Sequence, residues 1–254
     1  MEAYIRSVSR ALSVLEELNV NNGASILELH RATGISRPAL YRIIRTLENS
    51  GYLIADDVTQ RHLLTPLIKR LSDGFEQDSW ISEVAGPVLD DLQKQVTWPT
   101  DLFSFFNDSM VMRRTTRRAS PWTVDKARVG LRIPVLTTAC GRAYLAHLTE
   151  AAAEGLIERL RQSKLPGEKI AQDSRLVQRL LRKTRQDGYA LRERSFMRET
   201  CSVAVPVLNL GAARCSIAVT YVPSAISAKE VIERLVPLLK KAAAEIECDI
   251  KAAS

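Results

Sequence analysis

The segment 36–49 constrains the fold of this chain more than any other feature, because its two sides carry different chemistry. Apolar side chains recur at the i, i+3, i+4 and i+7 positions of a helix, at Leu40, Ile43, Ile44 and Leu47. Ser36 is a suitable N-cap, Pro38 fits the first helical turn, and Gly51 is a suitable stop. The segment therefore predicts one helix with a buried side and an exposed side.

The exposed side of this predicted helix is basic. It presents Arg37, Tyr41, Arg42 and Arg45 next to Pro38. Four arginines and no acidic residue occur between Glu28 and Glu48. Guanidinium groups can donate paired hydrogen bonds to guanine edges or to phosphates, so such a face suits the major groove of DNA. A merely solvated helix face is the alternative, and the surrounding elements have to decide between the two.

The surrounding sequence completes the pattern of a winged helix-turn-helix. Residues 5–18 repeat apolar side chains at helical spacing, and Ser25 with Glu28 forms a capping box that starts a second helix. Gly34 permits a tight turn before the third helix. The apolar runs 52–55 and 61–64 flank a polar turn and predict a hairpin, the wing. This combination favours DNA binding over a solvated face.

The residues expected to contact DNA follow from this arrangement. Arg37, Tyr41 and Arg42 are expected near the bases or their phosphates, and Arg45 on the backbone. Arg61 in the hairpin is expected at a phosphate or the minor groove. The full set of predicted DNA-binding residues is Ser25, Ser36, Arg37, Pro38, Tyr41, Arg42, Arg45, Gln60 and Arg61.

The net charge of +7 does not by itself support DNA binding. Up to Asp78 the chain has 9 basic and 10 acidic residues, whereas the remainder has 27 basic and 19 acidic residues. The excess of positive charge therefore lies outside the predicted DNA-binding part, and the argument rests on local patterning.

The rest of the chain predicts a linker and a larger α+β domain. Thr65 and Pro66 start an expected linker helix over residues 65–78. Helical segments then alternate with strand-like runs at residues 101–106, 109–116, 130–136, 189–193, 202–207 and 215–222. We expect a DNA-binding domain at 1–64, the linker helix at 65–78, and an effector-binding and oligomerisation domain at 79–254.

Several motifs resemble those of the IclR family of transcriptional regulators, in the same order along almost the whole chain. The N-terminal motifs are Gly34-Ile35-Ser36, Arg42, Leu47-Glu48 and Gly51-Tyr52. The C-terminal motifs are Gly130, Pro134, residues 138–146 from Thr138 to Ala146, Asp187-Gly188-Tyr189 and Ser202-Val203-Ala204-Val205-Pro206. This resemblance implies a winged helix-turn-helix, a linker helix and a GAF-like effector-binding domain. It also implies a homodimer or homotetramer on double-stranded operator DNA.

Within the family, the chain is most similar to regulators of aromatic-acid breakdown. The similarity lies in Trp80-Ile81-Ser82, Trp98-Pro99-Thr100-Asp101, Met110-Val111 and Ala204-Val205-Pro206. It implies an aromatic carboxylic acid such as a hydroxyphenylpropionate as the effector, activation of transcription, and contact with RNA polymerase. A repressor that responds to a small aliphatic acid is the alternative.

The resemblance also implies where the effector binds, at the turn into a helix around Cys140 and on the facing strands. A helix N-terminus suits an anion, and nearby aromatic side chains suit a ring, although each aromatic could instead belong to the core. The predicted effector-binding residues are Trp98, Phe103, Phe105, Ala139, Cys140, Gly141, Arg192, Ser202 and Ser216. Many relatives carry acidic residues near the position of Arg192, so its contact with the effector stays open.

A second basic stretch comprises Arg113, Arg114, Arg117 and Arg118. We expect these arginines to form a solvated strand edge that discourages strand pairing. A carboxylate contact from one of them is the alternative.

The sequence predicts neither an enzyme nor a metal site. The cysteines Cys140, Cys201, Cys215 and Cys248 are scattered without zinc-site spacing, so neither metal nor cofactor is expected. The three histidines are far apart, and no phosphate-binding or nucleophile motif occurs. A reactive Cys140 at a helix start is the enzymatic alternative.

No apolar stretch approaches the roughly 20 residues of a membrane span, so we expect a cytoplasmic protein without a membrane partner. A protein-docking module is the remaining alternative to a DNA-binding protein. Steeply salt-dependent binding to DNA distinguishes the two.

Overall fold

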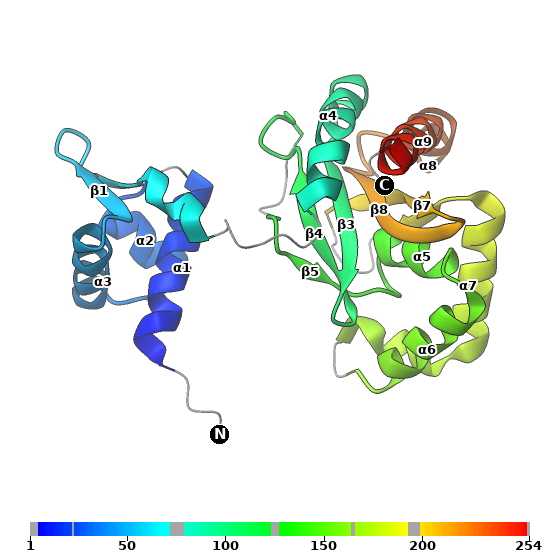
Figure 1. Ribbon diagram of the computed structural model, residues 1–254, viewed down its shortest axis with the longest axis horizontal. Helices are drawn as coiled ribbons and strands as arrows, with labels where there is room; N and C mark the ends of the chain where they lie inside the picture. The colour runs from blue at the N-terminus through cyan, green and yellow to red at the C-terminus, as the bar shows by residue number, and fades with distance from the viewer. Residues whose placement is uncertain are drawn as a thin grey trace. The chain divides into compact units, whose positions relative to one another are not determined.

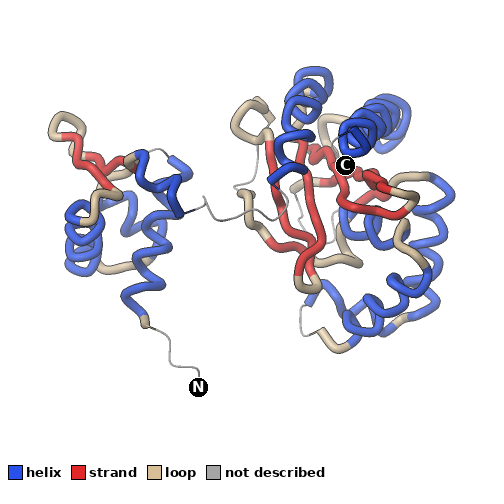
Figure 2. Tube along the Cα trace, in the orientation of Figure 1, coloured by secondary structure: helices blue, strands red, loops and turns tan. Residues whose placement is uncertain are grey.

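The structure is a computed structural model that describes residues 5–21, 23–71, 79–122, 127–163, 166–192 and 199–252. The chain divides into two compact units, Met1–Gln77 and Asp78–Ser254. Figure 1 gives the elements of each unit, and Figure 2 separates helices from strands.

The first unit contains three helices and a hairpin. The helices are α1 (Arg6–Asn21), α2 (Ile26–Thr33) and α3 (Arg37–Asn49), and the hairpin pairs β1 (Leu53–Asp56) with β2 (Arg61–Leu64) in antiparallel register. Leu18, Leu29 and Leu40 are fully buried where the three helices meet. A bridge between Ala24 and His62 ties the start of α2 to the hairpin.

Local interactions fix the ends of α2. The Ser25 hydroxyl accepts a hydrogen bond from the Glu28 amide, and the Glu28 carboxylate accepts one from the Ser25 amide, so the predicted capping box forms. Gly34 ends the helix at φ +69°, a left-handed conformation that costs glycine little. The sharp turn into α3 therefore depends on this glycine.

The expected linker helix over residues 65–78 lies only partly within the described residues. Residues Pro66–Leu71 form a 3₁₀ helix, η1, and residues 72–78 lie outside the described residues.

The second unit is built on a six-stranded antiparallel sheet with the strand order β5-β4-β3-β8-β7-β6. The strands are β3 (Thr100–Phe106), β4 (Ser109–Thr115), β5 (Arg132–Ile133), β6 (Ala190–Arg192), β7 (Cys201–Asn209) and β8 (Ala212–Tyr221). The helical segments are α4 (Ser79–Val96), α5 (Ala139–Ala146), α6 (Glu150–Arg161), η2 (Pro166–Gln172), α7 (Ser174–Asp187), α8 (Ala228–Glu230), η3 (Val231–Leu235) and α9 (Val236–Ala252).

Helices cover both faces of this sheet. Figure 1 shows α4 and α9 on one face, and α5 with α6 and α7 on the other. The strand residues alternate accordingly: Val203 and Val205 of β7 pack in the cluster of α4 and α9, whereas Ala204 packs in the cluster of α5. Two hydrophobic cores therefore share one sheet. The cavity of the second unit, described below, lies on the face of the sheet that α5 covers.

The predicted strand at 130–136 is shorter in the structure: Arg132–Ile133 forms β5 beside β4, Gly130 and Leu131 also hydrogen-bond to the backbone of Met112 in β4, and the pairing ends after Ile133. The amides of Val135 and Leu136 donate instead to the buried carboxylate of Glu168. A side chain from η2 therefore replaces a strand partner for this segment.

Candidate functional site

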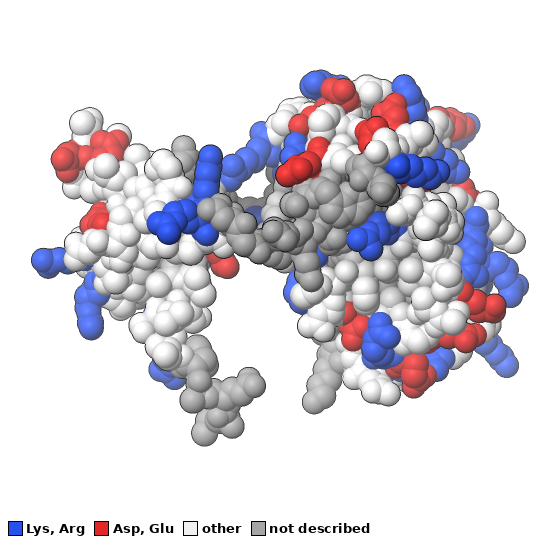
Figure 3. Space-filling view, viewed as in Figure 1, with Lys and Arg blue, Asp and Glu red and all other residues white. Residues whose placement is uncertain are grey.

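The outer face of α3 is exposed and basic. Arg37, Arg42 and Arg45 are exposed, and Tyr41 has 62% of its surface accessible. Figure 3 shows basic side chains protruding from the surface over α3. Within the described residues, none of the three arginines forms an ion pair. Leu40, on the opposite side of the helix, is fully buried, so the basic face of α3 points away from the core of the first unit.

The two predicted serine contacts differ in their surroundings. Ser36 occupies the N-cap position of α3, but its exposed hydroxyl makes no capping hydrogen bond. The hydroxyl of Ser25 is engaged with Glu28. Ser36 is therefore the serine whose hydroxyl is not engaged in a cap.

Arg61 and Gln60, the two hairpin residues predicted to bind DNA, contact other residues of the first unit. The Arg61 guanidinium lies 2.9 Å from the Glu28 carboxylate and donates to the Gly23 carbonyl at 3.3 Å. The Gln60 side chain donates to the Asp57 carbonyl at 3.0 Å. Acidic side chains gather at the hairpin turn (Figure 3). Hydrogen bonds from Thr59 and Val58 hold the pKa of the turn residue Asp56 below its ordinary value, so this turn stays negatively charged.

A small cavity lies between the sheet of the second unit and the start of α5. It is lined by Asp101, Phe103, Met112, Arg117, Ala127, Leu131, Ile133, Thr138, Cys140, Arg192, Ser202, Ala218 and Thr220. Its volume is about 40 Å³. That is room for about three water molecules at roughly 10–15 Å³ each.

Three charged side chains among the described residues are buried in the wall of this cavity. Asp101, Arg117 and Arg192 are 1%, 8% and 5% exposed. Arg117 forms an ion pair with Asp101, and the Thr220 hydroxyl lies 3.4 Å from both side chains. Arg192 donates to the hydroxyls of Ser202 at 3.0 Å and Thr200 at 3.1 Å.

The described lining thus contains two guanidinium groups and one carboxylate. Arg117 pairs with Asp101, and Arg192 donates to the hydroxyls of Ser202 and Thr200. With two guanidinium groups and one carboxylate, the described cavity wall suits an anionic ligand.

Cys140 lines the same cavity, and its thiol is buried. Burial, together with the negative charge of Asp101, raises its pKa to about 12 although Arg192 and Arg117 act in the opposite direction. The raised pKa is the opposite of the lowered pKa that a reactive Cys140 at the helix start would need.

The start of α5 is fixed by its cap and by Glu168. The Thr138 hydroxyl accepts from the Gly141 amide at 3.2 Å and donates to the Pro134 carbonyl at 2.6 Å. Burial raises the pKa of Glu168, against the lowering effect of the hydrogen bonds from Val135 and Leu136. The loop that carries the cavity wall into α5 is consequently well anchored.

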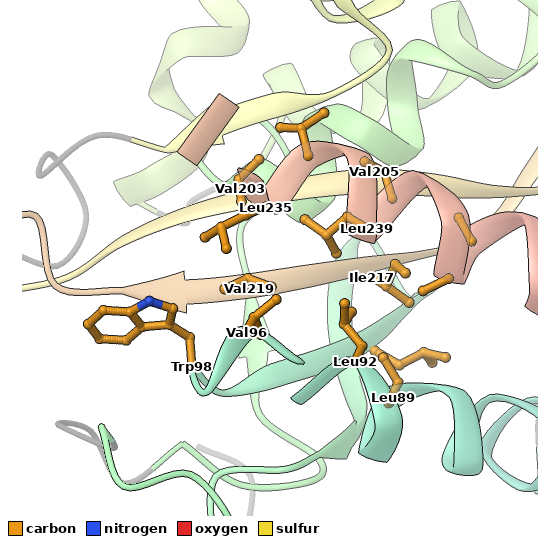
Figure 4. Close-up of a cluster of buried hydrophobic side chains, with 14 of the residues drawn as sticks. Leu89, Leu92, Val96, Trp98, Val203, Val205, Ile217, Val219, Leu235 and Leu239 are labelled. Atoms are coloured by element: carbon orange, nitrogen blue, oxygen red, sulfur yellow. The ribbon is translucent and has the colours of Figure 1, made fainter. Parts of the chain in front are cut away.

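Phe103, Cys140, Arg192 and Ser202 are the predicted effector residues that the structure brings together around the cavity. Trp98 lies instead in the cluster of α4 and α9 on the other face of the sheet, as Figure 4 shows.

The remaining predicted effector residues do not line the cavity. Phe105 stacks on Tyr144 at 5.5 Å between ring centres. Ala139 and Gly141 are buried within α5. Ser216 shares the sheet face of Ala218 but is fully buried without a hydrogen-bond partner among the described residues.

The second basic stretch does not behave as one solvated edge, so that prediction is wrong for Arg117, which is buried in the cavity wall. Arg113 donates to the Ser104 hydroxyl at 2.7 Å, and Arg114 pairs with Asp90 at 2.8 Å. Arg118 is exposed, as expected.

Asp101, Thr138 and Thr220 were missed as cavity residues by the sequence analysis. Asp101 could have been found, because it precedes Phe103 by two positions and therefore shares its face of the strand. Thr220 lies two positions after Ala218 in the same way.

In the described part of the chain, no group of three or more histidine, cysteine, aspartate or glutamate side chains could hold a metal ion. The helices of this part are also too short or too polar to cross a membrane.

Comparisons with known proteins agree with this architecture. Residues 7–57 match the model of the IclR helix-turn-helix domain, and residues 77–248 match that of the bacterial transcriptional regulator IclR C-terminal domain. The p-hydroxybenzoate hydroxylase transcriptional activator of Acinetobacter baylyi is 24% identical over 96% of this chain and 92% of its own length.

Two solved structures have the same fold. The Thermotoga maritima IclR structure is 21% identical with a TM-score of 0.71, over 97% of this chain and 99% of that chain. An IclR homologue from Microbacterium hydrocarbonoxydans, complexed with 4-hydroxybenzoate, is 20% identical with a TM-score of 0.65 over the same shares.

These matches confirm the predicted fold class, a helix-turn-helix unit followed by a GAF-like α+β unit. The two models cover most of the chain, and the longer one describes a bacterial transcriptional regulator. The chain therefore belongs to the IclR family of bacterial transcriptional regulators.

Proposed function

We propose that this regulator binds operator DNA through the exposed face of α3, and that a small aromatic carboxylate bound in the cavity of the second unit controls this binding. The observation that carries the proposal is the buried guanidinium of Arg192 in the wall of the cavity, where it donates to the hydroxyls of Ser202 and Thr200. In this proposal residues 1–64 form the DNA-binding domain, residues 65–78 the linker helix, and residues 79–254 the effector-binding and oligomerisation domain.

The two ends of such a ligand match two parts of the cavity. The carboxylate fits the guanidinium of Arg192 and the hydroxyl of Ser202, since charge-assisted hydrogen bonds are stronger than neutral ones. The ring fits the apolar wall of Phe103, Met112 and Ile133. The names of two relatives, one an activator of p-hydroxybenzoate hydroxylase and one bound to 4-hydroxybenzoate, support an aromatic acid.

A volume of about 40 Å³ is smaller than an aromatic acid. Binding therefore requires lining side chains to move. This requirement gives the effector a means of changing the conformation of the second unit, because a ligand shifts a protein toward the state that it binds better.

Calorimetric titration of the full chain tests the effector. We expect 4-hydroxybenzoate or 3-(4-hydroxyphenyl)propionate to bind, and neutral 4-hydroxybenzyl alcohol to bind at least about tenfold more weakly, because it lacks the charge that Arg192 recognises. Arg192→Gln should remove this preference for the acid, whereas Arg118→Gln, at an exposed position, should keep it. Equal binding of the alcohol, or binding of aliphatic acids alone, would contradict an aromatic carboxylate.

Fluorescence anisotropy with the DNA upstream of the chain's own gene tests the α3 face. Arg42→Gln should weaken binding by about tenfold to a hundredfold, since a base contact contributes roughly 1–3 kcal/mol. Arg10→Gln, at an exposed position on α1, is the matched control and should bind nearly as the wild type does. Wild-type affinity should fall steeply as salt rises. Absence of DNA binding at any salt concentration would favour the protein-docking alternative.

The direction of regulation needs a separate assay. We expect the effector to increase transcription, with the DNA-bound homodimer or homotetramer contacting RNA polymerase. Transcription in vitro from the upstream promoter, with and without the acid, measures this directly. A decrease caused by the protein alone and relieved by the ligand would identify a repressor.

A further inference from the structure

Helix α7 concentrates the positive charge that the first unit lacks. The chain after Asp78 has 27 basic and 19 acidic residues. The 14 residues of α7 include five of these basic residues and one acidic residue, Asp187. Half of the net positive charge after Asp78 therefore lies on this one helix, and neither the α3 face nor the effector cavity uses it.

The charged side chains of α7 gather on its exposed side. Val177 and Leu181, on the opposite side, are buried in the same core cluster as α5. A hollow of about 420 Å³ lies on the exposed side, and its described lining comes from α7 alone: Arg175, Gln178, Arg179, Arg182, Lys183 and Gln186. All six side chains can donate hydrogen bonds, and none is a carboxylate or apolar. Figure 3 shows basic side chains along the edge of the second unit at α7.

Three guanidinium groups of this lining have no partner in the described part of the chain. Arg175, Arg179 and Arg182 are exposed and form no ion pair or side-chain hydrogen bond there, whereas Lys183 pairs with Asp187 at 2.7 Å. We call the three arginines the α7 arginine row. At a rise of 1.5 Å per residue the row spans about 10.5 Å. That length matches about three steps between phosphates of one DNA strand, which follow at about 3.4 Å along the helix axis.

Acidic residues of the neighbouring helix α6 line a different hollow. Glu154 and Glu158 face the groove between α6 and α7, whose lining includes Gln178 but none of the α7 arginine row. Glu158 is also paired with Arg161 at 2.6 Å. The described lining of the hollow at the arginine row therefore presents positive charge without a carboxylate.

The chemistry of this face favours a nucleic acid over a protein or a membrane. Protein–protein interfaces have apolar and aromatic centres, and the described lining has no apolar side chain. Protein–DNA interfaces are more polar and more positively charged, and arginine and glutamine side chains donate to phosphate oxygens. The apolar side of α7 is buried in the fold, so it is not free to enter a lipid surface.

We propose that the α7 arginine row binds phosphates of the DNA that flanks the operator, as a second contact that does not depend on base sequence. This inference goes beyond the proposed function, which assigns DNA contacts to the first unit, and it rests on DNA binding by that unit. Binding of α3 raises the local concentration of DNA at the second unit, so that contacts that are weak alone add to the affinity.

Fluorescence anisotropy of the full chain at several KCl concentrations tests the proposal, with a long duplex from upstream of the chain's own gene. R175Q/R179Q/R182Q should weaken binding by about tenfold or more at low salt. It should also lower the slope of log Kd against log[KCl] by about 2–3, since each phosphate contact contributes about 0.9. R175K/R179K/R182K should restore most of both, because lysine keeps the charge.

The matched control K229Q/R234Q/K241Q also removes three exposed positive charges, on α8, η3 and α9. Each of these lies near a carboxylate, of Glu233, Glu230 and Glu245 respectively. The control should bind DNA with the affinity and the salt slope of the wild type.

The length of the duplex locates the contact. A duplex trimmed to the bases whose substitution weakens binding should bind the wild type about tenfold more weakly than the long duplex. A long duplex with scrambled flanks should bind as the original does, because phosphates carry no sequence information. R175Q/R179Q/R182Q should bind the trimmed and long duplexes equally, since it lacks the side chains that contact the flanks.

Two outcomes separate this contact from the proposed function. An unchanged affinity and salt slope of R175Q/R179Q/R182Q, with normal binding by the wild type, would overturn the α7 contact alone. Absence of DNA binding by the wild type would overturn both.

Two further measurements identify other roles of the α7 arginine row. Lost activation in transcription in vitro with unchanged DNA affinity would assign the row to an acidic protein surface. A changed assembly of the variant in sedimentation velocity would assign it to a subunit interface. Either result would overturn the proposal, and circular dichroism verifies that every variant is folded.

Discussion

Gly141 illustrates at the scale of one residue how closely α5 packs against the preceding loop. A Cβ atom at this position would lie 2.0 Å from the carbonyl oxygen of Val135 and 2.4 Å from its Cα. Both are backbone atoms that cannot move aside without shifting the cavity wall.

We expect Gly141→Ala to lower the free energy of unfolding of the second unit by about 2 kcal/mol or more, because overpacking forces the backbone apart. Gly155→Ala is the matched control on α6, where no atom lies within 4 Å of the added methyl group. It should be neutral or stabilise by about 0.5–1 kcal/mol through helix propensity. Denaturant unfolding measures both, and equal effects of the two substitutions would show that the contact with Val135 is unimportant.

The cysteines provide a second test at the residue scale. At pH 8 a thiol with a pKa of about 12 is ionised to about one part in ten thousand. Cys140, Cys201 and Cys215 are buried, and Cys248 is exposed. Iodoacetamide at pH 8 should therefore modify Cys248 alone, as peptide mass spectrometry can show, and native Cys248→Ser should remain unlabelled. Labelling of Cys140 at a comparable rate would contradict the assigned thiol pKa.

At the scale of elements, the N-caps of α2 and α3 make contrasting contributions to stability. Ser25 completes a capping box, whereas the Ser36 hydroxyl makes no capping hydrogen bond. Ser25→Ala should lower the free energy of unfolding of the first unit by about 1 kcal/mol. Ser36→Ala should change it by only about 0.3 kcal/mol, since no side-chain bond is lost. A larger loss for Ser36→Ala in thermal unfolding would contradict this assignment of the caps.

The same capping box should make the stability of the first unit depend on pH. Hydrogen bonds from the backbone and side chain of Ser25, and then the charge of Arg61, hold the pKa of Glu28 below its ordinary value of 4.5. The stabilisation by its carboxylate is therefore complete above that ordinary value and is lost as pH falls through the lower folded pKa. Wild type should be more stable than Glu28→Gln at pH 7, and the difference should shrink on acidification in urea unfolding. A difference that is constant from pH 7 to pH 3 would exclude this role of the carboxylate.

At the scale of the whole molecule, the division into two compact units predicts more than one unfolding transition. In scanning calorimetry of the full chain, Ser25→Ala should shift the transition of the first unit and Gly141→Ala that of the second. An effector that binds the cavity should raise the second transition alone. One transition that moves as a whole with every variant and ligand would show that the units unfold together.

The sequence determined the elements whose pattern is local. The N-terminal helices and hairpin follow from the spacing of apolar residues, the Ser25–Glu28 capping box and the turn at Gly34, and the structure has all of them. The exposure of Arg37, Tyr41 and Arg42 follows in the same way, because Leu40 and Ile44 fix which side of α3 is buried. The order of helical and strand-like segments predicted the α+β class of the second unit, and the family motifs implied its GAF-like fold, which the domain matches confirm.

Only the tertiary structure decided which distant residues meet in the cavity. Arg117 and Asp101 pair across 16 positions of the chain, and Glu168 reaches the amides of the segment before α5 from 33 positions away. Trp98, which was predicted to contact the effector, packs on the other face of the sheet with α4 and α9. Sequence periodicity reports which residues share a face of one element, whereas the position of a buried charge depends on which elements pack together and which counter-charge they bring.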